Sequence, residues 1–225
     1  MKTLLSLLLS LLSVSSITGQ NAPAAVALPK VALIGDSIRL SYAPTVIREL
    51  KGVAEIVSPK ANGGDSGNVL KNLESWAISA KPDVVHFNCG IHDTKKFKST
   101  GRFQVSPDKY EANLRAIVKR IRDQTEAVVI FGTTTPILDD RAAAKRQGRN
   151  YDLTGAAIEQ YNAIAVRIMR ELKVPINDLN AVITKPAKLH TTGQLVGSDG
   201  VHMNPPAREL LGNQVVEIIR KQLNR

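Results

Sequence analysis

The sequence has a single cysteine and few aromatic residues. Cys89 is its one cysteine, so no disulfide can form within the chain, and the core has to be stable without one. Phe, Trp and Tyr together make up 4% of the 225 residues, which leaves few rings on which nucleic-acid bases could stack. These absences disfavour a disulfide-stapled domain and specific nucleic-acid recognition.

Long hydrophobic runs are also lacking after the N-terminus. Lys2, an apolar stretch from Leu4 to Leu12 and then small polar residues are typical of a secretory signal peptide over residues 1–19. No later stretch approaches the ~20 apolar residues that a membrane-spanning helix needs. We expect a secreted or periplasmic protein with no lipid anchor, a flexible segment over residues 20–29, and one domain over residues 30–225.

Acidic residues are outnumbered, since the formal charge is +10 and removal of residues 1–19 leaves +9. The basic residues are scattered through helix-like stretches such as "NLRAIVKRIRDQ" and the segment "RAAAKRQGR". A basic surface of this kind attracts anions in general. An acidic polysaccharide is therefore a more plausible partner than nucleic acid.

Short apolar runs alternate with amphipathic stretches of ten or more residues, the pattern of a parallel α/β fold. The predicted strands are Val31 to Ile34, Ala54 to Val57, Val84 to Phe87, Ala127 to Phe131 and Val174 to Ile176. The predicted helices are Ile38 to Lys51, Asn68 to Ser79, Pro107 to Thr125, Gly155 to Leu172 and Pro205 to Leu223. Apolar strands covered on both faces predict a three-layer α/β/α sandwich with a five-stranded parallel sheet.

Reactive groups in such sheets gather beyond the carboxyl ends of the strands. Ser37 follows the first predicted strand in "GDSI", and Asp199 and His202 lie three residues apart in the loop "SDGVH". Each also fits a structural role, as a helix cap, a turn residue or a surface histidine. Together they predict a serine nucleophile, a histidine base and an aspartate that orients the base. The long segment over residues 135–155 is predicted to be a loop over this site.

The sequence resembles the SGNH or GDSL hydrolases, which are esterases on a flavodoxin-like sheet. "GDSI" is similar to the block that supplies the nucleophile, and "SDGVH" is similar to the Asp-x-x-His block. The resemblance extends from Lys30 to the C-terminal helix. It implies that Ser37, His202 and Asp199 form a catalytic triad.

The resemblance also implies an oxyanion hole. Within "ANGGDSGN" it indicates the backbone N–H of Gly64, with Gly67 as the rival. Where family members show Gly-x-Asn-Asp, this chain has Gly90-Ile91-His92-Asp93, so either the His92 ring or the nearby Asn88 supplies the side-chain donor. The amide of Asn88 is slightly favoured, because it donates at every pH whereas a neighbour must fix a histidine's tautomer.

A metal site and a nucleotide site are the non-hydrolytic alternatives at these loops. His92, Asp93, Asp199 and His202 have no metal-binding spacing, and no phosphate-binding glycine motif is present. We expect no metal and no cofactor. The predicted function is a secreted serine esterase, with a carbohydrate acetyl ester as the preferred substrate. The alternatives are a lysophospholipase or thioesterase, and a catalytically silent carbohydrate-binding protein.

Overall fold

The structure is a computed structural model that describes residues 27–185 and 190–224. The predicted signal peptide and residues 20–26 of the predicted flexible segment lie outside the described residues. The centre of the fold is a five-stranded parallel sheet in the order β2-β1-β3-β5-β7. Its strands are β1 (Lys30–Ile34), β2 (Glu55–Val57), β3 (Val84–Phe87), β5 (Val128–Gly132) and β7 (Ile176–Asn177). The predicted sheet is confirmed, with strand ends moved by up to two residues.

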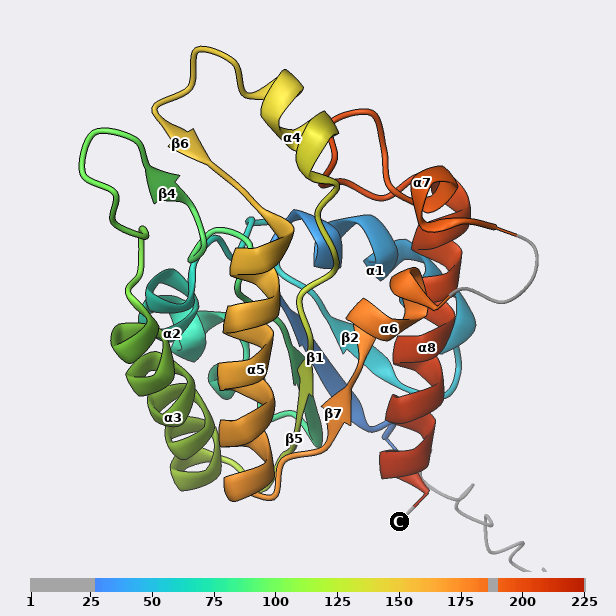
Figure 1. Cartoon of the computed structure of the whole chain (residues 1–225). Helices are drawn as coiled ribbons and strands as arrows, with labels where there is room; N and C mark the ends of the chain where they lie inside the picture. The colour runs from blue at the N-terminus through green and yellow to red at the C-terminus, as the bar shows by residue number, and fades with distance from the viewer. Residues whose placement is uncertain (1–26, 186–189, 225) are drawn as a thin grey trace, which may run out of the picture.

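Both faces of this sheet are buried, which explains the continuous apolar strands. In β1, Val31 and Leu33 belong to one core cluster, whereas Ala32 and Ile34 belong to another on the opposite face. The first cluster is completed by α1 (Ser37–Glu49), α6 (Leu179–Thr184) and α8 (Pro205–Leu223). The second is completed by α2 (Ser66–Trp76), α3 (Pro107–Gln124) and α5 (Gly155–Glu171). Figure 1 shows α2, α3 and α5 on one side of the sheet and α8 on the other, so the predicted three-layer sandwich is confirmed.

Polar side chains fix where several helices begin. Asp36 accepts a hydrogen bond from the Ile38 N–H, and Asp65 accepts one from the Asn68 N–H. Ser106 and Thr154 cap α3 and α5 in the same way. Such caps satisfy N–H groups that have no acceptor within the helix. With these caps, α1 starts one residue before its predicted position, and α2 starts two residues before its own.

The predicted loop over residues 135–155 contains regular structure, which corrects the sequence-based prediction. It includes α4 (Asp139–Lys145) and β6 (Tyr151–Asp152), and β6 pairs antiparallel with β4 (Lys96–Phe97). Strands of two residues are too short to produce a recognisable alternation. Figure 1 shows α4, β4 and β6 beyond the carboxyl ends of the main strands, so the segment does lie over that edge. The remaining short elements are the 3₁₀ turn η1 (Ile78–Ala80) and α7 (Thr192–Leu195).

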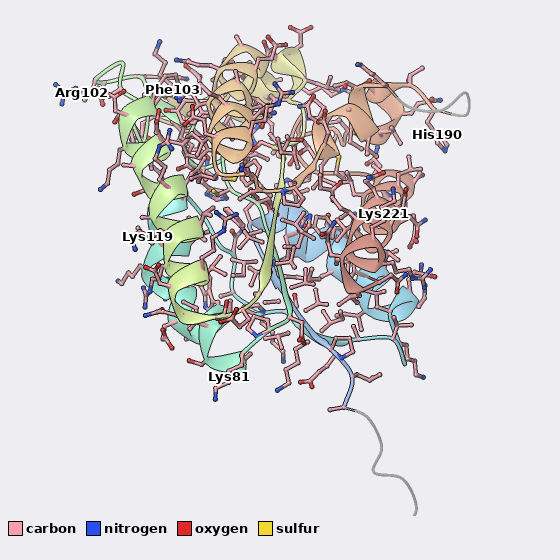
Figure 2. The ribbon with its side chains drawn as sticks, turned by 90° about the horizontal axis from the view of Figure 1, so that it is seen from below. Lys81, Arg102, Phe103, Lys119, His190 and Lys221 are labelled. Atoms are coloured by element: carbon pink, nitrogen blue, oxygen red, sulfur yellow. The ribbon has the colours of Figure 1, made fainter. Side chains whose placement is uncertain are left out.

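The basic side chains are spread over the surface. In Figure 2 the labelled side chains of Lys81, Arg102, Lys119 and Lys221 extend outward from different elements. Within the part of the chain that the structure describes, no helix combines the length and the apolar character needed to cross a membrane.

Candidate active site

Ser37 lies in the turn that joins the carboxyl end of β1 to α1. Asp36, which precedes Ser37, is buried and caps α1, and Ser37 is the first residue of that helix. Backbone N–H groups in a first helical turn have no acceptor within the helix, and the helix dipole favours negative charge there. The turn therefore exposes a hydroxyl at a position that stabilises an anion.

Asp199 and His202 lie in the loop before α8. Asp199 Oδ2 contacts His202 Nδ1 at 2.5 Å, and Asp199 Oδ1 accepts the backbone N–H groups of Val201 and His202 at 3.0 and 2.9 Å. Partial burial acts to raise the pKa of Asp199, but the hydrogen bonds from the His202 ring and from the two N–H groups lower this pKa to about 2. Asp199 is therefore ionised at neutral pH and holds the imidazole in one orientation.

The second ring nitrogen of His202 reaches the hydroxyl of Ser37. His202 Nε2 is 3.0 Å from Ser37 Oγ, although the residues are 165 positions apart. A carboxylate on Nδ1 keeps the proton there and leaves Nε2 free to accept one. The fold thus assembles the three sequence-predicted residues into a continuous hydrogen-bonded series with the geometry of a base and a hydroxyl nucleophile.

Gly64 lies in the loop after β2. It has φ of +62°, which favours glycine, and its N–H donates to Asn62 Oδ1 at 2.9 Å. Asn62 lines the same cavity as Ser37, whereas Gly64 is not among the lining residues and is connected to the cavity through this hydrogen bond. The rival Gly67 lies inside the first turn of α2, next to the side chains of Asp65 and Asn113.

A buried arginine holds the Gly64 loop against the Ser37 turn. Arg39 is 1% exposed, and its guanidinium donates to the carbonyl oxygens of Gly35, Pro59 and Ala61 and to Ser58 Oγ. The Gly63 N–H also donates to the Gly35 carbonyl at 2.9 Å. The two loops are therefore fixed relative to each other by one side chain and one backbone hydrogen bond.

We expect Arg39→Met to lower the free energy of unfolding by about 2–3 kcal/mol, because methionine makes none of the four hydrogen bonds that the guanidinium donates to the two loops, and hydrogen bonds from a charged group contribute about 1.5–3 kcal/mol. Urea unfolding followed by circular dichroism measures the change. Arg48→Met on the same helix is the control, since Arg48 is exposed and pairs with exposed Glu209, and such pairs contribute little. Equal stability of the two variants would contradict the role of Arg39.

Asn88 lies beneath the Ser37 turn. The residue is 4% exposed, its Nδ2 donates to Asp36 Oδ1, and its Oδ1 accepts from the Tyr42 hydroxyl, both at 3.4 Å. A Cβ at Gly35 would come within 2.1 Å of Asn88 Oδ1, which shows how closely the turn packs on this amide. Asn88 is absent from the residues that line the cavity at Ser37.

His92 does line that cavity, together with Ser37 and His202. It lies in the turn after β3, where the Thr94 N–H donates to the Gly90 carbonyl at 3.0 Å. The Nδ1 atom of His92 is 3.1 Å from the Nζ atom of Lys95. Burial and the Lys95 ammonium lower the pKa of His92.

Asp93 ties the His92 turn to the Gly64 loop. Its buried carboxylate accepts the Ser66 N–H at 3.0 Å and the Ser66 hydroxyl at 2.5 Å. Burial raises the pKa of Asp93 to about 7, against the opposing effect of these hydrogen bonds. The side chain therefore anchors two of the loops that surround Ser37.

The cavity at Ser37 is small, about 170 Å³. Its lining residues are Ser37, Asn62, Ile91, His92, Lys95, Arg146, Tyr151, Leu153, Val201 and His202. A larger depression of about 420 Å³ lies at Lys81, Asp83 and Glu126, before β3 and β5. It is therefore at the amino ends of the strands, away from Ser37. Among residues 27–185 and 190–224, no group of three or more His, Cys, Asp or Glu side chains is arranged to hold a metal ion.

Several residues at this site were not predicted from the sequence, among them Arg39, Lys95, Arg146 and Tyr151. Arg39 carries only a weak signal, a charge placed between apolar helix residues. Lys95 follows His92 by three positions, a spacing that would have suggested a contact. Arg146, whose Nη1 donates to the Asp199 carbonyl at 2.9 Å, and Tyr151 lie in the segment for which the sequence predicts a loop.

The fold and this serine, histidine and aspartate series are those of a hydrolase built on a flavodoxin-like parallel sheet. Residues 33–210 match the GDSL-like Lipase/Acylhydrolase family. The chain therefore belongs to this family, the GDSL or SGNH hydrolases, and is a carboxylic ester hydrolase. A comparison with curated protein sequences found no match.

Solved structures of this fold are similar over most of the chain. A lipase/acylhydrolase from Enterococcus faecalis is 20% identical with a TM-score of 0.70, covering 87% of this chain and 97% of its own. An acetylxylan esterase from Geobacillus stearothermophilus is 21% identical with a TM-score of 0.68, covering 86% and 94%. Another acetyl xylan esterase is 20% identical with a TM-score of 0.67, covering 84% and 99%. At these identities the likeness establishes the fold.

Proposed function

We propose that the protein is a secreted serine esterase that acts through an acyl-enzyme intermediate. The observation that carries this proposal is the hydrogen-bonded series from Asp199 to His202 to Ser37. His202 takes the hydroxyl proton of Ser37 while Ser37 Oγ attacks the ester carbonyl. His202 then gives this proton to the leaving alcohol. A water molecule, activated by the same imidazole, hydrolyses the acyl-enzyme. Secretion rests on the sequence of residues 1–19.

The developing oxyanion is stabilised by N–H donors around Ser37. The backbone N–H of Ser37 is available at the start of α1, and the Gly64 N–H is held by an amide oxygen that the substrate oxygen replaces. Gly64 is favoured over Gly67, which lies within a helical turn. Donors that are already in position cost no reorganisation when charge develops.

His92 is the better candidate for the side-chain donor, which reverses the slight preference for Asn88 drawn from the sequence. The cavity position of His92 supports this assignment. The buried amide of Asn88 supports a structural role instead, because Asp36 already accepts from its Nδ2. Asn88 then orients the Asp36 cap that begins α1.

A carbohydrate acetyl ester fits the site best. The cavity of about 170 Å³ is smaller than the ~300–1,000 Å³ of pockets that enclose drug-sized ligands. It has room for a short acyl group while the rest of a glycan lies outside. Lys95 and Arg146 are among the residues that line the cavity, and their positive charges favour a glycan that carries negative charge. Two of the similar structures are acetylxylan esterases, which agrees with this substrate class.

We expect hydrolysis of p-nitrophenyl esters to fall steeply as the acyl chain lengthens beyond butyrate, because the cavity cannot enclose a longer chain. A series from acetate to octanoate, with acetylated xylan and acetylated acidic glycans alongside, measures this dependence. Faster turnover of long chains would support the lysophospholipase or thioesterase alternative. Binding of acetylated glycans without turnover of any ester would support the catalytically silent alternative.

A further inference from the structure

The segment around His92 contains a feature that the catalytic series does not explain. Lys95 follows His92 by three residues, and its Nζ atom lies 3.1 Å from His92 Nδ1. A lysine ammonium has three N–H donors and no lone pair. In this contact Lys95 therefore donates, and His92 Nδ1 accepts.

That direction fixes the tautomer of His92. A neutral imidazole carries one proton, so an accepting Nδ1 leaves the proton on Nε2. The ring edge that bears Nε2 is then the donor edge, and His92 lines the same cavity as Ser37 and His202. The family's asparagine presents an amide N–H at every pH, and a histidine held as this tautomer likewise presents a ring N–H.

An aromatic contact and a strand pairing hold Lys95 in place. Its Nζ atom lies 5.3 Å from the centroid of the Tyr151 ring, a cation–π arrangement. Tyr151 belongs to β6 and pairs with Phe97 of β4, the strand that begins directly after Lys95. The small β4/β6 sheet thus holds the Tyr151 ring beside Lys95, whose Nζ atom also contacts His92.

We propose that Lys95 is a positioning residue that holds His92 as the Nε2–H tautomer, so that His92 donates to the oxyanion in place of the family's asparagine. The inference rests on the proposed esterase function and adds the source of one donor. The other charged or titratable groups that act on His92 are Asp36, Asp65 and His202. Asp36 and Asp65 favour protonation of His92, whereas burial, Lys95 and His202 oppose it.

Nitrogen-15 NMR of the histidine rings tests the tautomer without any turnover. At mildly alkaline pH, wild-type His92 should show a protonated Nε2 and an unprotonated Nδ1, with its signals assigned by their loss in His92→Asn. In Lys95→Met the chemical shifts of His92 Nδ1 and Nε2 should both move toward intermediate values, because no donor at Nδ1 then keeps the ring proton on Nε2. A protonated Nδ1 in the wild type, or unchanged shifts in Lys95→Met, would overturn the proposal.

Kinetics on an acetyl ester test the consequence. Lys95→Met should lower kcat by about three- to tenfold with KM nearly unchanged, a smaller loss than the ~10²–10³ for an oxyanion donor itself. Lys95→Arg should retain most of the rate, since it keeps a donor. Lys96→Met is the control, because it removes the same charge one residue away, at a side chain over Phe103, and should leave the rate unchanged.

A double-mutant comparison separates positioning from charge. In a His92→Asn background, where the amide needs no tautomer, Lys95→Met should have no further effect on kcat. The same loss in both backgrounds would mean that Lys95 acts through its charge, and would overturn the positioning role. A wild type that hydrolyses no ester would reject the proposed function, while the NMR result would still decide the tautomer.

Discussion

Replacing Ser37 by alanine is expected to lower kcat for ester hydrolysis by a factor on the order of 10³ or more. Ser37 Oγ is the atom that His202 Nε2 approaches at 3.0 Å, and alanine removes that oxygen alone. Within residues 27–185 and 190–224, no other side-chain hydroxyl lies within hydrogen-bond distance of the His202 ring. The measurement is steady-state hydrolysis of p-nitrophenyl acetate by the purified variant.

The Ser37 variant should fold normally, because alanine keeps the Cβ and Asp36 still caps α1. Circular dichroism and a thermal melt compared with the wild type check this. Ser41→Ala is a matched control on the same helix, since its hydroxyl donates only to the Ile38 carbonyl. Near-wild-type turnover by the folded Ser37 variant would reject the mechanism.

The second large effect concerns the side-chain donor of the oxyanion hole. We expect His92→Ala to lower kcat by roughly 10² to 10³ with little change in KM, because the lost donor strengthens chiefly in the transition state. Asn88→Ala should instead affect stability, since it removes an amide that contacts Asp36 and Tyr42 in the core. Both variants are compared on one activated ester, after circular dichroism confirms that each is folded.

The opposite pattern has a clear meaning. Full kcat in the His92 variant and a large loss in a stably folded Asn88 variant would restore the sequence-based preference. No kinetic effect of either substitution would leave the backbone N–H groups of Ser37 and Gly64 as the only donors. Urea unfolding of the Asn88 variant separates a loss of stability from a loss of catalysis.

The sheet and the approximate bounds of its helices could be predicted because their signals are local. Continuous apolar strands such as the run from Val31 to Ile34 in β1 and amphipathic helices between the strands determine the layers. The grouping of Ser37, Asp199 and His202 could be predicted for a related reason. The carboxyl ends of parallel strands meet at one edge, so residues that follow different strands lie together.

Other features depend on contacts between distant segments, which no local pattern encodes. The burial of Asn88 under Gly35 follows from the packing of the β1 turn against the end of β3. The role of Arg39 follows from carbonyl groups in a loop some twenty residues away. The β4/β6 pair joins two segments that are too short to show alternation, so its contact with Lys95 could not be foreseen.

Covalent labelling tests most directly whether Ser37 is the nucleophile. The purified protein is treated with a fluorophosphonate, which reacts with activated serines, and is then analysed by intact-mass spectrometry and peptide mapping. We expect one adduct per chain, located on Ser37, with labelling abolished in Ser37→Ala and strongly slowed in His202→Ala. An adduct on another residue, or no adduct in a protein that hydrolyses esters, would contradict the assignment of Ser37.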